Sequence, residues 1–294
     1  MDNTLVSENS RSLSLRDLFA RSKPRISSMG LLTTACGWGL APVEVSLITS
    51  LATLLGTLMI VAAANTLNCW LEVEVDSHMP RTANRPLPAG RLETWVALVM
   101  GLVLGVASVL VLNFAVNSLT ALVGASALFL YVGVYTPLKL KTPYALLIGA
   151  IPGAAPPLMG WTAATGRIDL AGFTLFAILF LWQLPHFIAI SIFRKDEYVL
   201  AGIRVFPWAK GLKSAKRHAA FYTMLLFIAS MVLYAIGLVG SIYLTVATLS
   251  GTVFLAWALW GLQEYKERRW AKKFFLLSLL YVTLLFPAMV FDAI

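Results

Sequence analysis

The chain has 294 residues, of which 59% are hydrophobic and 13% charged, and its mean hydropathy is +0.80. This composition is too apolar for an ordinary soluble domain, and it predicts a polytopic membrane protein with an all-α fold. The formal net charge of +9 does not indicate a nucleic-acid partner, because the basic residues fall between apolar stretches rather than along one soluble face.

The first 25 residues are polar and basic, without an apolar core ahead of a small-residue cleavage site. They predict a cytoplasmic N-terminal segment, 1–25, rather than a cleavable secretory signal. Residues 26–294 are expected to form a single transmembrane domain. Its apolar stretches predict nine membrane helices, at about residues 26–43, 46–76, 93–113, 116–135, 143–164, 169–193, 219–239, 242–263 and 274–292.

Lysine and arginine are distributed unevenly between the two ends of these helices. With the N-terminus in the cytoplasm, 22 of the 23 fall on the cytoplasmic side, and Arg167 alone falls on the other. Because cytoplasmic loops are enriched in lysine and arginine, this pattern predicts the orientation of the chain. The charged loops after the second and sixth helices are then cytoplasmic, the C-terminus is on the opposite side, and any chemistry is expected at the cytoplasmic face.

The end of the second predicted helix carries oxygen-bearing side chains at a depth where they are costly. Asn68, Glu72 and Asp76 follow one another at i, i+4 and i+8, which places them on nearly the same face of a helix. Mg²⁺ takes one or two carboxylates together with phosphate oxygens and waters. The spacing therefore predicts a magnesium site that would attract a diphosphate.

Basic side chains that suit phosphate oxygens follow this acidic face. Arg81 and Arg85 lie four residues apart in a loop containing three prolines, and guanidinium groups bind phosphate oxygens in a bidentate manner. Tyr135 and Lys139 lie at the inner end of the fourth helix, where Lys139 is a further candidate for phosphate. An alternative reading is that these cations face water and lipid headgroups, as basic residues of cytoplasmic loops usually do.

The fifth predicted helix, at 143–164, is dense in glycine, alanine and proline. Small residues let neighbouring helices approach closely, and prolines interrupt the helical hydrogen bonds. We expect this helix to line the central cavity rather than to take part in chemistry.

The sixth predicted helix and its loop hold a second polar set. Asp196 and Glu197 form an acidic pair, which could share a pair of Mg²⁺ ions with the first acidic face across one diphosphate. His186 lies about two turns earlier, in the word WQLPH that begins with Trp182 and Gln183. A buried imidazole could orient a substrate, carry a proton or approach a haem iron, and a hydrogen-bonded packing histidine is equally consistent with the spacing.

These motifs together resemble the UbiA superfamily of intramembrane prenyltransferases. Asn68, Glu72 and Asp76 followed by RTANRP resemble the first signature of that superfamily, whose members are similar in having nine transmembrane helices around a cavity and two acidic motifs that bind Mg²⁺-diphosphate. Within the superfamily, the branch that farnesylates haem b is the most similar. The words that carry this resemblance lie at residues 23–25, 81–90, 135–139, 149–161, 182–187, 196–203 and 278–281.

The resemblance implies transfer of a farnesyl group from farnesyl diphosphate to the 2-vinyl group of haem b, giving haem O. It implies Mg²⁺ as cofactor and a haem A synthase as a candidate partner. The short N-terminal segment without a transit-like extension favours the lipid bilayer of a bacterial inner membrane as location. The implied catalytic residues are Asn68, Glu72, Asp76, Arg81, Arg85 and Lys139, the implied metal ligands are Asn68, Glu72, Asp76, Asp196 and Glu197, and the implied substrate-binding residues are Tyr135, Trp182, Gln183, His186 and Tyr198. Glu72 and Glu197 depart from the pattern, because aspartate is common at both positions.

Two alternatives remain open from the sequence. The first is a UbiA-type enzyme that prenylates an aromatic ring such as 4-hydroxybenzoate. The second is a transporter in which Glu72, Asp76 and Asp196 form a path for a cation or proton. A transporter would place its acids near the middle of the membrane, whereas these acids are predicted at one edge, beside long basic loops.

Overall fold

The computed structural model describes residues 24–80 and 82–294. The predicted N-terminal segment, apart from its last two residues, and Arg81 lie outside the described residues. Within the described part of the chain, secondary structure is helical apart from an isolated β-bridge between Val239 and Ala293. The predicted all-α fold is therefore confirmed.

Eight helices within the described residues are long and apolar enough to cross a membrane. They correspond to α3 (Leu47–Leu71), α5 (Thr94–Ala115), the span Ser118–Leu138, α8 (Ala145–Thr165), α9 (Leu170–Phe193), α12 (Leu212–Ala235), α13 (Ser241–Trp260) and α14 (Glu267–Phe291). The first predicted membrane helix is α2 (Pro24–Gly39), which at 16 residues is shorter than the others. The prediction of nine helices thus corresponds to eight clear membrane spans and this shorter helix.

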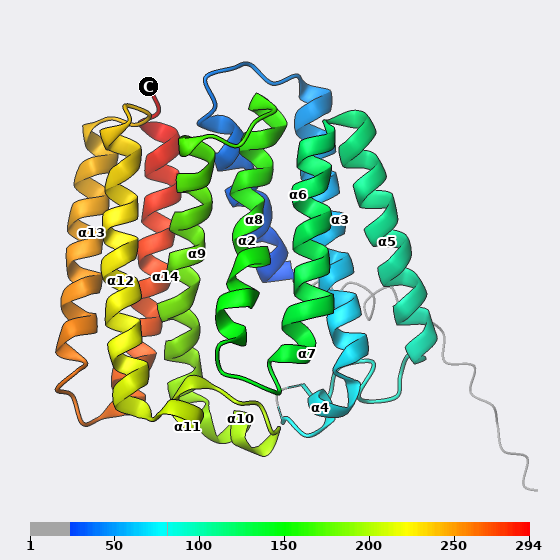
Figure 1. Ribbon diagram of the computed structural model, residues 1–294, viewed down its shortest axis with the longest axis vertical. Helices are drawn as coiled ribbons and strands as arrows, with labels where there is room; N and C mark the ends of the chain where they lie inside the picture. The colour runs from blue at the N-terminus through cyan, green and yellow to red at the C-terminus, as the bar shows by residue number, and fades with distance from the viewer. Residues whose placement is uncertain (1–23, 81) are drawn as a thin grey trace, which may run out of the picture.

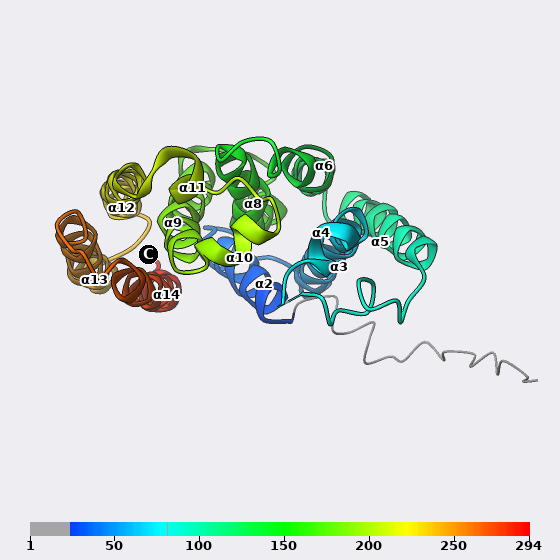
Figure 2. The same cartoon turned by 90° about the horizontal axis from the view of Figure 1, so that it is seen from below.

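The long helices run side by side in two groups joined by a central set (Figure 1 and Figure 2). α3, α5 and α6 (Ser118–Phe129) lie on one side, α12, α13 and α14 lie on the other, and α2, α8 and α9 lie between them. The short helices gather at one end of the molecule, at the bottom of Figure 1: α4 (Val73–Ser77), α7 (Thr136–Leu138), α10 (Lys195–Leu200) and α11 (Phe206–Lys210). The connections that hold lysine and arginine lie at this same end, which we call the basic end, whereas the loop with Arg167 lies at the other.

The second membrane helix is not continuous to residue 76, as the sequence had predicted. Glu72 has φ −107° and ψ 15°, so α3 ends at Leu71 and α4 begins at Val73. Backbone hydrogen bonds nevertheless cross the break, from Glu72 N to Asn68 O at 3.0 Å and from Asp76 N to Glu72 O at 2.7 Å. The break changes the direction of the chain and still leaves the three predicted side chains near one another.

The fourth membrane helix also departs from a regular α-helix. After α6 the chain forms a π-helix, η1 (Leu130–Tyr135), before the short α7. Such segments have wider hydrogen-bonded turns and are often found at functional sites. η1 lies at the basic end and carries Tyr131 and Tyr135.

α2 and α8 pack closely because glycine faces backbone on both helices. A Cβ atom on Gly37 would overlap the carbonyl oxygen of Pro157, and one on Gly160 would overlap that of Thr34. The close approach that the small residues of 143–164 predicted is therefore confirmed. Only the start of α8, at Ala145 and Leu146, lines the cavity that opens at the basic end, so the proline-rich middle serves packing instead.

Candidate active site

A cavity of about 300 Å³ opens at the basic end, between α3, η1 and α9. Its wall includes Asn68, Glu72, Asp76, Arg85, Tyr131, Tyr135, Lys139, Tyr198 and Arg204. Six of these were predicted as site residues from the sequence: Asn68, Glu72, Asp76, Arg85, Tyr135 and Lys139. Tyr198, expected from resemblance, lines the same cavity. Charged and aromatic groups from segments far apart in the sequence therefore meet in one place.

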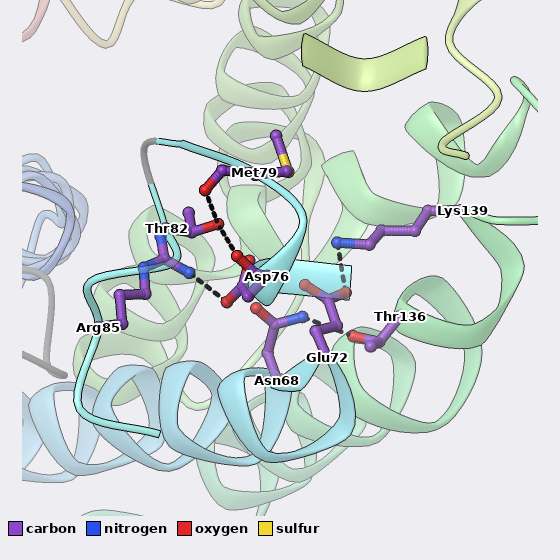
Figure 3. A network of polar contacts seen from close by, with 8 residues as sticks. All are labelled: Asn68, Glu72, Asp76, Met79, Thr82, Arg85, Thr136 and Lys139. Atoms are coloured by element: carbon purple, nitrogen blue, oxygen red, sulfur yellow. Dashed lines mark hydrogen bonds and ion pairs between the residues drawn. The ribbon is translucent and has the colours of Figure 1, made fainter. Parts of the chain in front are cut away.

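Both carboxylates of the first acidic face are buried and each is paired with a cation. Glu72 is 5% exposed and forms an ion pair with Lys139, while Asp76 is 4% exposed and its Oδ2 lies 2.6 Å from Nη1 of Arg85 (Figure 3). Buried charges are stable only when they are paired or bound to metal. The cations predicted to bind phosphate thus neutralise the acids predicted to bind metal.

The loop after α4 folds back around Asp76. The hydroxyl of Thr82 donates to the carbonyl oxygen of Asp76 at 2.8 Å, and the backbone N–H of Arg85 donates to Thr82 O at 2.9 Å. These bonds hold Arg85 where its guanidinium reaches the Asp76 carboxylate. The backbone of Asp76 therefore anchors the loop, and the loop places Arg85 against the Asp76 side chain.

Asn68 connects α3 to the fourth membrane helix. Its side chain is 4% exposed, and Nδ2 donates to Oγ1 of Thr136 at 3.1 Å. In Figure 3 the amide oxygen of Asn68 lies away from Thr136, on the side of Asp76. The amide therefore presents an oxygen beside the two carboxylates.

Aromatic rings form the part of the cavity wall that follows the π-helix. The ring centroids of Tyr131 and Tyr135 lie 5.3 Å apart. Gly149 of α8 makes room for Tyr135, since a Cβ there would come within 2.6 Å of the ring. Sequence reasoning missed Tyr131 and Arg204, and also Thr136 behind the wall. No spacing rule links these residues to the acidic face, because they lie more than 50 residues away in the sequence and come close only through helix packing.

The second acidic pair lies outside the wall of this cavity. Asp196 is exposed, and Glu197 accepts hydrogen bonds from Nη1 of Arg194 at 2.7 and 3.0 Å. In the part of the chain that the structure describes, no group of three or more His, Cys, Asp or Glu side chains is close enough to hold a metal ion. The two acidic motifs are therefore not joined into one site in this conformation.

The WQLPH word packs between helices instead of lining the cavity. Trp182 Nε1 donates to the carbonyl oxygen of Ser278 on α14 at 2.7 Å, and Nδ1 of His186 lies 2.7 Å from the Ser278 hydroxyl. Gln183 donates to Ala150 O at 3.1 Å. The imidazole stacks on Trp182, with ring centroids 4.8 Å apart. Trp182 and Gln183, predicted to bind substrate, thus contact neighbouring helices here, and the bond to Ser278 is of the kind expected for a packing His186.

The tautomer of His186 follows from its partner. The Ser278 hydroxyl donates its single hydrogen to the carbonyl oxygen of Phe275 at 2.6 Å, so toward the imidazole it can only accept. With the hydroxyl hydrogen on Phe275 O, a neutral His186 donates from Nδ1 and Nε2 presents a lone pair.

The oxygen set of the first acidic face fits a hard divalent cation. Asn68, Glu72 and Asp76 supply one amide and two carboxylate groups, and all three line the same cavity. Oε1 of Glu72 is buried and has an ion pair but no hydrogen bond. Mg²⁺ accepts such a set when phosphate oxygens and waters complete its coordination.

Comparisons with known proteins identify the family of this chain. Residues 30–280 match the UbiA prenyltransferase family. The chain is 45% identical over 278 residues to a protoheme IX farnesyltransferase of Myxococcus xanthus (strain DK1622), covering 95% of each protein. It is also 45% identical over 278 residues to the protoheme IX farnesyltransferase of Anaeromyxobacter sp. (strain Fw109-5), covering 95% of this chain and 94% of that protein.

Solved structures share the fold at low sequence identity. A structure of digeranylgeranylglyceryl phosphate synthase superposes with a TM-score of 0.80 at 17% identity, covering 95% of this chain and 98% of that one. A UbiA homologue from Archaeoglobus fulgidus bound to GPP and Mg²⁺ superposes with a TM-score of 0.70 at 16% identity, covering 93% and 99%. The match over residues 30–280 and the relatives at 45% identity establish that the chain belongs to the UbiA prenyltransferase family.

Proposed function

We propose that this protein transfers the farnesyl group of farnesyl diphosphate to the 2-vinyl group of haem b. The observation that carries the proposal is the 45% identity, over nearly the whole chain, to relatives named protoheme IX farnesyltransferase. The cavity at the basic end supports it, because it combines paired carboxylates and cations with an aromatic wall. No contact in the described residues favours the transporter alternative, since the acids lie at one end of the helices.

Asn68, Glu72 and Asp76 would hold Mg²⁺, which supplies positive charge against the diphosphate when it is bound. Arg85 and Lys139 lie at the same cavity and would donate hydrogen bonds to the diphosphate oxygens, as would Arg81. On binding, Arg85 and Lys139 would exchange a carboxylate partner for a phosphate partner, so the site would keep its charges compensated. Neutralising the leaving group lowers the barrier to breaking the allylic C–O bond.

The bond electrons leave with diphosphate, and the vinyl group of haem supplies the electron pair for the new carbon–carbon bond. Water then adds to the resulting cation and loses a proton, which gives the hydroxyl of the hydroxyethylfarnesyl arm. Before that step, water must be kept from the allylic cation. The rings of Tyr131, Tyr135 and Tyr198 form the wall that would exclude it.

The second acidic pair and the WQLPH word would act from outside the cavity wall. Asp196 and Glu197 would join the metal site only after α10 turns toward the cavity, and Glu197 would have to leave Arg194. His186 would meet haem through Nε2, while Trp182 and Gln183 hold the helix that carries it. We further propose a bacterial inner membrane as the location, with a haem A synthase collecting the product.

The first experiment is a product assay with purified protein, haem b, farnesyl diphosphate and Mg²⁺. The variant Asp76→Asn keeps the shape of the side chain but removes its charge, and Glu44→Ala serves as a control at an exposed acid outside the cavity wall. We expect a farnesylated haem that requires Mg²⁺, is lost in Asp76→Asn and persists in Glu44→Ala. Diphosphate release without a haem product would assign a different acceptor, such as an aromatic ring.

A further inference from the structure

Thr136 lies behind the first acidic face, where the π-helix η1 ends and α7 begins. Its side chain is 3% exposed, and it does not line the cavity. Thr136 contacts the site through Asn68 alone among the proposed metal ligands, by the 3.1 Å hydrogen bond to Nδ2. The hydroxyl of Thr136 is buried, and its hydrogen-bond partners are Asn68 and Tyr131.

The Thr136 hydroxyl donates one hydrogen bond and accepts another. The hydroxyl lies 2.8 Å from the carbonyl oxygen of Tyr131, which can only accept, so the single hydroxyl hydrogen is donated there. Toward Asn68 the hydroxyl therefore offers only a lone pair. Asn68 must present its NH₂ group to that lone pair, and its Oδ1 must point the other way. The two hydrogen bonds and the amide orientation therefore form one consistent set.

The π-helix supplies the carbonyl that starts this chain of bonds. The backbone N–H of Thr136 donates to Tyr131 O across five residues, and the Thr136 hydroxyl donates to the same oxygen. In a regular α-helix Tyr131 O would accept from residue 135 instead. The wide turn thus brings the Thr136 side chain to a carbonyl that holds its hydrogen away from Asn68.

We propose that Thr136 is a positioning residue that keeps Oδ1 of Asn68 directed into the cavity as a ligand for a divalent cation. The inference rests on the proposed function, because it assumes that Asn68 contributes to the metal site. An amide binds a cation through its oxygen, whereas its NH₂ group repels one. Without Thr136 the amide loses the contact that selects between its two orientations.

The test measures binding of Mn²⁺ in the presence of inorganic diphosphate, by electron paramagnetic resonance of the purified protein. Thr136→Val removes the hydroxyl and keeps the branched shape, Thr136→Ala removes it with less bulk, and Thr136→Ser keeps it. Partners that orient metal ligands typically change affinity by about 10- to 100-fold. We expect a loss of about 10-fold in Thr136→Val and Thr136→Ala, and near-complete recovery in Thr136→Ser.

The same substitution in an Asn68→Asp variant separates the orientation of the residue-68 side chain from general packing. Asn68→Asp has an oxygen on both sides of the side chain, so its orientation no longer matters. We expect Thr136→Val to cause no further loss of Mn²⁺ affinity in this background. A full loss there would mean that Thr136 only supports packing, and would overturn the inference.

Failure of the inference and failure of the proposed function give different results. If the unmodified protein binds Mn²⁺, Asp76→Asn abolishes binding and Thr136→Val binds normally, the metal site stands and the role of Thr136 is refuted. If the unmodified protein does not bind Mn²⁺ with diphosphate, both the metal site and the inference are refuted.

Discussion

At the scale of single residues, the site is organised by pairing charges that would otherwise be buried alone. Glu72 with Lys139 and Asp76 with Arg85 form two compensated pairs at one cavity. The acidic members could be predicted from the sequence, because their spacing of four residues survives the break at Glu72. Arg85 and Lys139 could be predicted as phosphate ligands. Their pairing with Asp76 and Glu72 could not, since nothing in the sequence places Lys139 against Glu72.

The first prediction at this scale concerns the pair of Glu72 and Lys139. Lys139→Met leaves a largely buried carboxylate without a partner, and we expect the free energy of unfolding to fall by about 2 kcal/mol, less than for fully buried pairs because the pair borders a cavity. Adding Glu72→Gln should recover most of this loss. Denaturant unfolding of the purified variants checks both values.

Transferase activity should respond differently from stability in the same variants. The double variant lacks both a cation and a carboxylate of the site, so its activity should stay low although its stability returns. Stability that does not return in the double variant would argue that Lys139 acts on folding through other contacts.

The second prediction concerns His186, whose Nε2 lone pair suits a haem iron. We expect His186→Ala to shift the absorption spectrum of bound haem b and to weaken haem binding on titration. His78→Ala is the control, because His78 is an exposed residue of the loop after α4. An unchanged spectrum with normal haem affinity in His186→Ala would leave this histidine as a packing residue.

At the scale of helices, hydropathy located the membrane spans but not their polar ends. The helices predicted from residues 219 and 274 begin at Leu212 and Glu267, because lysine, arginine and glutamate are good helix formers even where the chain leaves the apolar region. The break at Glu72 and the π-helix were not predictable either. The break and the π-helix lie on the two helices that the hydrogen bond from Asn68 to Thr136 joins, and contacts between helices cannot be predicted from hydropathy.

The third prediction tests the close packing of α2 on α8. Gly37→Ala places a Cβ against the backbone carbonyl of Pro157, which cannot move without shifting a helix, and we expect a loss of about 1–3 kcal/mol in unfolding free energy. Gly30→Ala on the same helix meets its nearest atom at 3.7 Å. It should be neutral or up to about 1 kcal/mol stabilising, owing to the better helix propensity of alanine. Equal stabilities for the two variants would contradict the helix contact.

At the scale of the whole molecule, the long helices place the basic connections at one end, together with the cavity (Figure 1). The distribution of lysine and arginine predicted this grouping, because each membrane crossing reverses the chain and the basic loops recur at every second connection. The same distribution predicts that this end faces the cytoplasm.

The fourth prediction tests this orientation by cysteine labelling in intact cells. Tyr265→Cys lies at the basic end, where Tyr265 is 93% exposed, and Arg167→Cys lies at the other end. A membrane-impermeant maleimide should label Arg167→Cys from outside and reach Tyr265→Cys only after the membrane is opened. The native Cys36 and Cys69 are buried and should stay unlabelled. The reverse pattern would invert the orientation.

The π-helix between Leu130 and Tyr135 makes this span more tolerant of losing a residue than of gaining one. The backbone N–H of Thr136 reaches Tyr131 O across five residues, so losing one residue between them would leave the four-residue bond of an α-helix. Lys139 would then stay near Glu72, and Thr136 near Asn68. An inserted residue would instead rotate both side chains by about 100° unless the turn widened again, so we expect gene variants of this segment to lose a residue more readily than to gain one.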